Sequence, residues 1–156
     1  MFKARNDVNA IVHRHCDDFM PFVSADIPMG VVTHEGSVFY DGIRFMERLP
    51  GMDGCRVLPE EYGFMLEALG ERRAFFIRYH GAILVGESTV SLVASSLYLK
   101  KNAIALYRML ALGAPSYLDE KSAMNSAKEV LEPVMIERIW GYYLQRARRN
   151  MLDLYW

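Results

Sequence analysis

The segment that decides the fold is ARNDVNAIVHRH, which spans residues 4–15. Its residues Val8 to His13 are apolar and partly β-branched, a composition that predicts a short strand. His13 and His15 form a His-x-His pair at the end of that strand. Because side chains alternate along a strand, residues i and i+2 project from the same face, so both imidazoles can reach one metal ion.

A second segment, RYHGAILVG at residues 78–86, carries another histidine between two predicted strands. The strands are expected at residues 74–79 and 82–86, with His80 and Gly81 between them. Glycine here leaves room for a ligand close to the backbone and permits a turn that aims His80 at the sheet edge. Three histidines from two strand ends are typical of a catalytic metal site, which keeps one coordination position open. Imidazole suits zinc, and also manganese or iron when carboxylate or water completes the shell.

A second interpretation of the histidines stays open, because a His-x-His pair also occurs by chance on a solvated strand. The fourth histidine, His34, lies in a loop-like stretch and is interpreted as a solvated residue. Cys16 would extend the pair to His-x-His-Cys, but a buried and inert cysteine is the favoured interpretation. The sequence has only two cysteines, Cys16 and Cys55, so it implies no disulfide framework and favours a reducing compartment.

The length of 156 residues predicts one domain. Apolar residues make up 52% and charged residues 24%, so the chain can bury a core and is not disordered. Eighteen basic and nineteen acidic residues give a net charge of −1, which removes the electrostatic argument for binding nucleic acid or an anionic membrane. No run approaches the roughly 20 apolar residues of a membrane span, and the N-terminus lacks a signal peptide. We therefore expect a cytoplasmic protein.

The chain divides near residue 87 into a turn-rich, β-like part and a helical part. In the first part, Ser37 to Tyr40 is predicted as a short strand before a turn at Asp41 and Gly42, and residues 49–54 as a loop. The predicted helices are a single turn at 19–24, a helix from Pro59 to Gly70, a long helix from Ser88 to Gly113, and a helical region from Glu120 to about Asn150 broken at Pro133. Together these elements predict a small sheet covered by helices.

Four of these segments, in this order, resemble the class II aldolase/adducin family. Residues 4–15 are similar to that family's R-x-D-V-x-A-V-V-H-x-H segment, and Ile27-Pro28-Met29 falls where the family has an l-P element. Residues 66–70 and 78–86 are similar to its aLG and HG-x-x-x-x-G segments, and residues 88–113 to the long helix that follows. The similarity extends to about residue 120.

The resemblance implies a three-layer α/β/α fold with a mixed, mainly antiparallel central sheet, assembled as a homotetramer. It implies one divalent metal ion, zinc or in some members manganese, held by His13, His15 and His80. It also implies that residues 1–156 form a single domain, the C-terminal two-thirds of the family fold. The expected N-terminal truncation would remove a Gly/Ser-rich substrate loop and a carboxylate that acts as acid/base or extra ligand.

The same resemblance implies a reaction class. Enzymes of this family cleave or epimerise sugar phosphates through an enediolate, or decarboxylate hydroxy-aromatic and related acids. We therefore expect a metal-dependent carbon–carbon lyase, an aldolase or a decarboxylase, acting on a small hydroxy-carbonyl or hydroxy-acid substrate. Tyr142 and Tyr143 are the candidates for a catalytic tyrosine supplied across a subunit interface, and no motif identifies substrate-binding residues. Asp17, Asp18 and Glu87 are candidates to orient the histidines.

One alternative function stays open. The chain can be a catalytically incomplete protein, or an adducin-like interaction protein without enzymatic activity, that retains the metal site. The expected absence of the leading segment favours this alternative, and so does Lys100, which stands where the family's long helix often has a glutamate.

Overall fold

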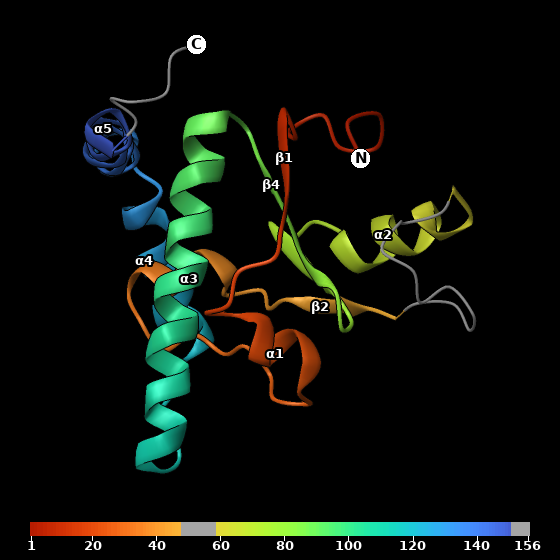
Figure 1. Ribbon diagram of the computed structural model, residues 1–156, viewed down its shortest axis with the longest axis horizontal. Coiled ribbons are helices and arrows are strands. Elements are labelled where there is room, and N and C mark those ends of the chain that lie inside the picture. Colours follow the sequence, from red (N-terminus) through yellow and green to blue (C-terminus); the bar gives the residue numbers. More distant parts are fainter. Residues whose placement is uncertain (48–58, 151–156) are drawn as a thin grey trace.

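The computed structural model describes residues 1–47 and 59–150, and its centre is a four-stranded sheet (Figure 1). The strands are β1 (Ala10–Arg14), β2 (Arg44–Met46), β3 (Ala74–Ile77) and β4 (Gly81–Gly86), and their order in the sheet is β1-β4-β3-β2. β4 pairs antiparallel with both β1 and β3, whereas β2 pairs parallel with β3. The expected mixed, mainly antiparallel sheet is therefore confirmed.

Helices cover both faces of this sheet. The α-helices are α1 (Met20–Ser24), α2 (Tyr62–Leu69), α3 (Thr89–Leu112), α4 (Glu120–Val130) and α5 (Pro133–Asn150), and two 3₁₀ helices are η1 (Glu35–Phe39) and η2 (Pro59–Glu61). Figure 1 shows α2 on one side of the strands and the long α3 on the other. Within residues 1–47 and 59–150, no helix combines the length and the apolarity that a membrane span requires.

Alternation along the central strands explains why both faces carry a core. Phe75 on β3 and Val85 on β4 pack with Leu69 of α2 in one apolar cluster. Their neighbours Phe76 and Leu84 point the other way and pack with α3 in a second cluster. Every residue of β3 and β4 is buried. The expected three-layer α/β/α arrangement is therefore confirmed.

Local end signals set the helix boundaries close to the predicted positions. The Ser88 side chain accepts a hydrogen bond from the Ser91 N–H, and the Ser91 side chain accepts one from the Ser88 N–H, so α3 begins with a capping box. It ends before Gly113, whose φ of 141° few other residues adopt. The predicted break at Pro133 is also confirmed, because α4 ends at Val130 and Pro133 begins α5.

The predicted strand at Ser37 to Tyr40 is wrong. These residues lie in or next to η1, where the Ser37 N–H donates to the His34 carbonyl and the Tyr40 N–H to the Ser37 carbonyl. Tertiary packing overrides the local β propensity: residues 36–39 are buried against α3 and α4, and the backbone hydrogen bonds of this segment close within the helical turn. The Asp41-Gly42 turn is confirmed, with Gly42 at φ 81°, and it leads into β2, which the sequence pattern missed.

Three predicted strands have different ends in the structure. The first lies at Ala10–Arg14 rather than at residues 8–13. The strand predicted at residues 74–79 ends at Ile77, because Tyr79 has a φ of 56°, which extended backbone excludes. The strand predicted at residues 82–86 begins at Gly81. The predicted loop at residues 49–54 lies outside the described residues.

Candidate metal centre

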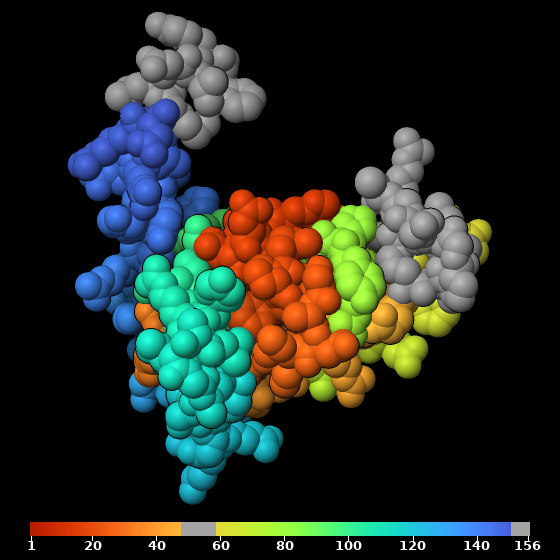
Figure 2. Space-filling view, turned by 60° about the horizontal axis from the view of Figure 1, so that its bottom comes forward, coloured from red at the N-terminus to blue at the C-terminus, as the bar shows by residue number. Residues whose placement is uncertain are grey.

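The pairing of β1 with β4 brings the three histidines together. His13 lies in β1 opposite Ile83, His15 is the first residue past the end of β1, and His80 directly precedes β4. Because the strands run antiparallel, the end of β1 lies beside the start of β4. Figure 2 shows the same neighbourhood on the surface, where the orange N-terminal region lies directly beside the yellow-green residues near position 80.

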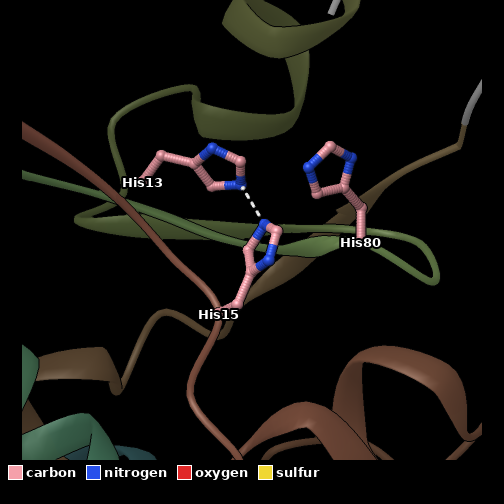
Figure 3. A group of neighbouring side chains, drawn as sticks. All are labelled: His13, His15 and His80. Carbon is pink, nitrogen blue, oxygen red and sulfur yellow. Dashed lines mark hydrogen bonds between the residues drawn. The ribbon is translucent and has the colours of Figure 1, made fainter. Parts of the chain in front are cut away.

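The three imidazole rings converge with nearly equal spacing (Figure 3). The ring centroids are 4.8 Å apart for His13 and His15, 4.9 Å for His13 and His80, and 4.9 Å for His15 and His80. One ring nitrogen from each histidine lies within 4.8 Å of the other two. Three side chains of one ligand type therefore surround a common point at the end of the sheet.

The donor set fits a divalent metal ion. The Nε2 atoms of His13 and His15 are 3.2 Å apart, and one donates a hydrogen bond to the other when it carries the proton. Two nitrogens bound to one zinc ion at 2.0–2.1 Å in tetrahedral geometry would be separated by roughly 3.3 Å. The nitrogens of His13 and His15 thus already lie at about the separation that zinc requires, and the set of three, within 4.8 Å, has to close further around an ion. Three protein ligands leave a position for water or substrate.

The electrostatic setting favours the neutral imidazole of His13. Its partial burial lowers the pKa, and the neighbouring His15 lowers it further. A metal ion competes with protons for the imidazole lone pair, so a lowered pKa leaves more of the ring in the form that binds metal.

The carboxylates proposed to orient the histidines have other contacts. Among residues 1–47 and 59–150, no aspartate, glutamate or cysteine joins the three histidines as a further ligand. The Lys100 Nζ lies 2.9 Å from an oxygen of Asp18, and the Arg73 guanidinium lies 3.6 Å from Glu87 at the far end of β4. Asp17 is exposed. Asp18 is thus bound to α3, and Glu87 is not beside the histidines.

His34 and Cys16 play separate parts. His34 precedes η1 with an exposed side chain, and its Nε2 lies 3.7 Å from Glu129 of α4, so the predicted solvated histidine is confirmed. Cys16 is half-buried rather than buried, and its thiol donates to Asp18 at 3.6 Å. Cys55 lies outside the described residues.

Tyr142 and Tyr143 lie on α5, with their rings 5.0 Å apart and edge to face. The apolar side of α5 packs on the core through Ile136 and Ile139. In Figure 1, α5 lies across α3 from the sheet, so the structure does not bring these tyrosines to the histidines within one chain. A role for either tyrosine stays a prediction that requires a second copy of the chain.

Arg78 is a residue that the sequence pattern missed. Its guanidinium stacks over the Phe45 ring at 3.9 Å and donates to Glu47 and Asp26, each at 3.0 Å. These contacts hold the turn that carries His80 against β2 and the segment after α1. An arginine just past a strand end and two residues before a histidine was the only available signal, because its partners lie far away in the sequence.

The family of the chain follows from its sequence. Residues 1–106 match the family model described as Class II Aldolase and Adducin N-terminal domain. This match covers more than half of the chain, and the chain belongs to that family. A comparison with curated protein sequences gives no significant match.

Solved structures of similar fold agree with this assignment. The L-fuculose 1-phosphate aldolase from Glaciozyma antarctica PI12 is 25% identical, with a TM-score of 0.75 over 97% of this chain and 56% of that one. An aldolase II superfamily protein from Pseudomonas syringae has a TM-score of 0.80 and 16% identity over 97% of this chain and 61% of that one, a likeness of fold alone. This chain therefore spans about three fifths of the length of these structures.

Proposed function

We propose that the chain is the metal-binding part of a carbon–carbon lyase, an aldolase or a decarboxylase. The convergence of His13, His15 and His80 at one end of the sheet, in a member of this family, supports the proposal. The substrate class is a small hydroxy-carbonyl compound or hydroxy acid that reacts through an enediolate or enolate. Because the chain spans about three fifths of the similar structures, the activity of the whole protein is part of the proposal.

The three histidines would hold one zinc ion, with manganese as the alternative. When bound, such an ion supplies Lewis acidity that stabilises negative charge on a substrate oxygen. The contribution of the chain is rigid placement. His13 belongs to a strand, His15 and His80 each adjoin one, and the two strands are paired, so the imidazoles are held near one another before any ligand binds.

The lysines of α3 bear on the choice of substrate. Lys100 is paired with Asp18, and Lys101 with Glu35. Each ammonium group has a carboxylate partner, and neither is assigned to a substrate phosphate. A substrate panel should contain sugar phosphates such as L-fuculose 1-phosphate, the substrate named for a similar structure, together with unphosphorylated hydroxy acids.

We also propose a homotetramer in which α5 of one copy brings Tyr142 or Tyr143 toward the histidines of another. The exposure of Tyr142, at 59%, is consistent with a side chain that has a partner outside its own chain.

The metal content of the purified protein tests the proposed centre. After reconstitution with zinc or manganese, mass spectrometry should find about one ion per chain, and His80→Ala should lose it, because two imidazoles bind far less tightly than three. His34→Ala is the matched control, since it removes an exposed histidine outside the cluster and should keep the ion. A folded wild-type chain that takes up neither metal would contradict the proposed centre.

Turnover of the substrate panel separates an enzyme from an interaction protein. Metal-dependent cleavage or decarboxylation that is lost in His80→Ala supports the lyase. A chain that binds metal but turns over nothing favours the alternative of an incomplete or adducin-like protein.

A further inference from the structure

Gly81 connects His80 to β4, and its backbone conformation does not require glycine. The described glycines with positive φ are Gly42, Gly70 and Gly113, and Gly81 is not among them. It occupies an ordinary strand position, where it pairs with Ile77. A residue with a side chain could adopt this backbone, so any need for glycine must come from the space around it.

That space is filled by the two other histidines. A Cβ atom built on Gly81 would lie 2.7 Å from Cδ2 of His15, 2.7 Å from the Arg14 carbonyl oxygen and 3.1 Å from Nε2 of His13. Non-bonded carbon atoms are comfortable at about 3.5–4.0 Å, so the 2.7 Å contact with His15 Cδ2 is too short. The 2.7 Å contact with the Arg14 carbonyl oxygen is also too short, and the 3.1 Å contact with His13 Nε2 is tight. The His13 and His15 rings thus lie close against the Cα atom of Gly81.

We propose that Gly81 is a positioning residue for the three-histidine centre, an inference that rests on the proposed function. Because Gly81 has no side chain, the His13 and His15 rings can pack directly against its backbone. The preceding residue, His80, supplies the third imidazole. A methyl group at this position would turn the His15 ring away or push β1 from β4 at Arg14. Either change separates the ring nitrogens that now lie within 4.8 Å of one another.

Metal affinity of Gly81→Ala is the first test, with Zn²⁺ alone as the probe in a competition titration. Displacing a group that orients metal ligands costs about 10–100-fold in affinity, and a loss of at least tenfold is expected. The visible spectrum of bound Co²⁺ should also change, because it reports the geometry of the ligands.

Gly86→Ala is the matched control at the other end of β4. Its Cβ would lie 3.1 Å from Leu92 and Ser91, so this variant strains the packing of α3 without touching the histidines. It should bind Zn²⁺ as the wild type does. Equal affinity of wild type and Gly81→Ala would overturn the positioning role alone, whereas a wild type that binds no Zn²⁺ would overturn the proposed function and the role together.

Unfolding by urea in the absence of metal is the second test, and it asks whether the His15 ring is the obstacle. The midpoint should fall for Gly81→Ala in the wild-type background and fall less in the His15→Ala background, where the ring is missing. An equal fall in both backgrounds would assign the cost to the Arg14 carbonyl and overturn the part of the inference in which the His15 ring packs on Gly81. If Gly81→Ala does not fold, a folded double variant supports the inference and an unfolded one overturns it.

Discussion

At the scale of single residues, Arg5 ties the segment before β1 to the turn between α2 and β3. Its Nε donates to Asp7 at 2.7 Å, and its Nη1 donates to the carbonyl oxygens of Gly70 and Arg72 at 2.6 and 3.2 Å. The hydrogen bond from Arg5 lowers the pKa of Asp7 from 3.8 to about 2. The start of the histidine-bearing strand is thus fixed partly by a charge pair.

This pair predicts a pH-dependent contribution to stability. Because the folded-state pKa of Asp7 lies below its ordinary value, the contribution is complete above pH 3.8 and is lost as the pH falls through about 2. Asp7→Asn should therefore lower the urea midpoint at about pH 6 and have little effect at about pH 2. The effect should be small, since the Asp7 side chain is more than half exposed. Asp17→Asn, at another exposed aspartate, is the control; a midpoint loss independent of pH would exclude the proposed linkage.

Residue types alone identified the three candidate ligands, but they did not identify the residues that pack around these ligands. Strand alternation predicted that His13 and His15 share one face, and their rings do lie 4.8 Å apart although His15 is just past the end of β1. His80 joins them only through the register of β1 and β4. The partners of Arg78 and the rings packed on Gly81 come from contacts between distant segments, for which the local sequence carries no signal.

At the scale of elements, Asn102 joins α3 to the segment between α1 and η1. Its Oδ1 accepts hydrogen bonds from the Val32 and Thr33 N–H groups at 2.9 and 3.2 Å, and its Nδ2 donates to the Gly30 carbonyl at 2.8 Å. The side chain is 2% exposed, so water cannot replace these partners. The Asn102 amide therefore provides hydrogen-bond partners for the backbone of residues 30–33, which do not pair with a strand.

Removal of this amide should destabilise the fold strongly. Asn102→Ala leaves buried N–H and carbonyl groups without partners, and the free energy of unfolding should fall by about 3 kcal/mol. Urea unfolding measures this loss. Asn125→Ala, at an exposed position on α4, is the matched control and should change stability by less than about 0.5 kcal/mol. Similar midpoints for the two variants would refute the structural role of Asn102.

Elements with their own end signals were predicted well, and elements that depend on neighbours were not. α3 has a serine cap and a terminal glycine, each of which acts within one helical turn. η1 lacks such signals, and its buried face is set by α3 and α4. Packing between elements accordingly decided η1, whose type was predicted wrongly, and β2, which was missed.

At the scale of the whole molecule, the histidine centre would link the end of β1 to the start of β4. These positions are distant in sequence, so the unfolded chain cannot hold the same site. A ligand that binds only the folded state stabilises it, by about 2.7 kcal/mol when its free concentration is one hundred times Kd. The proposed metal should therefore be a measurable part of the stability of the molecule.

A chelator tests this expectation. Removing zinc should lower the melting temperature of the wild-type protein, and addition of zinc should restore it. His80→Ala is the control, because without the third ligand its melting temperature should hardly respond to the chelator. A wild-type melting temperature that is the same with and without chelator would show that metal binding and folding are not coupled.

The sequence by itself determined the helix ends at Gly70, Ser88 and Gly113, the break at Pro133, and the identity of the candidate ligands, because caps, glycines and prolines act on their immediate neighbours. Only the tertiary structure decided the sheet order, with β2 parallel to β3, and the 3₁₀ helix in place of a strand. It also decided the meeting of His15 with His80 and the packing of the His13 and His15 rings on Gly81. These features depend on pairing and packing between segments that are distant in the sequence. The free energy of such contacts cannot be read from any local sequence pattern.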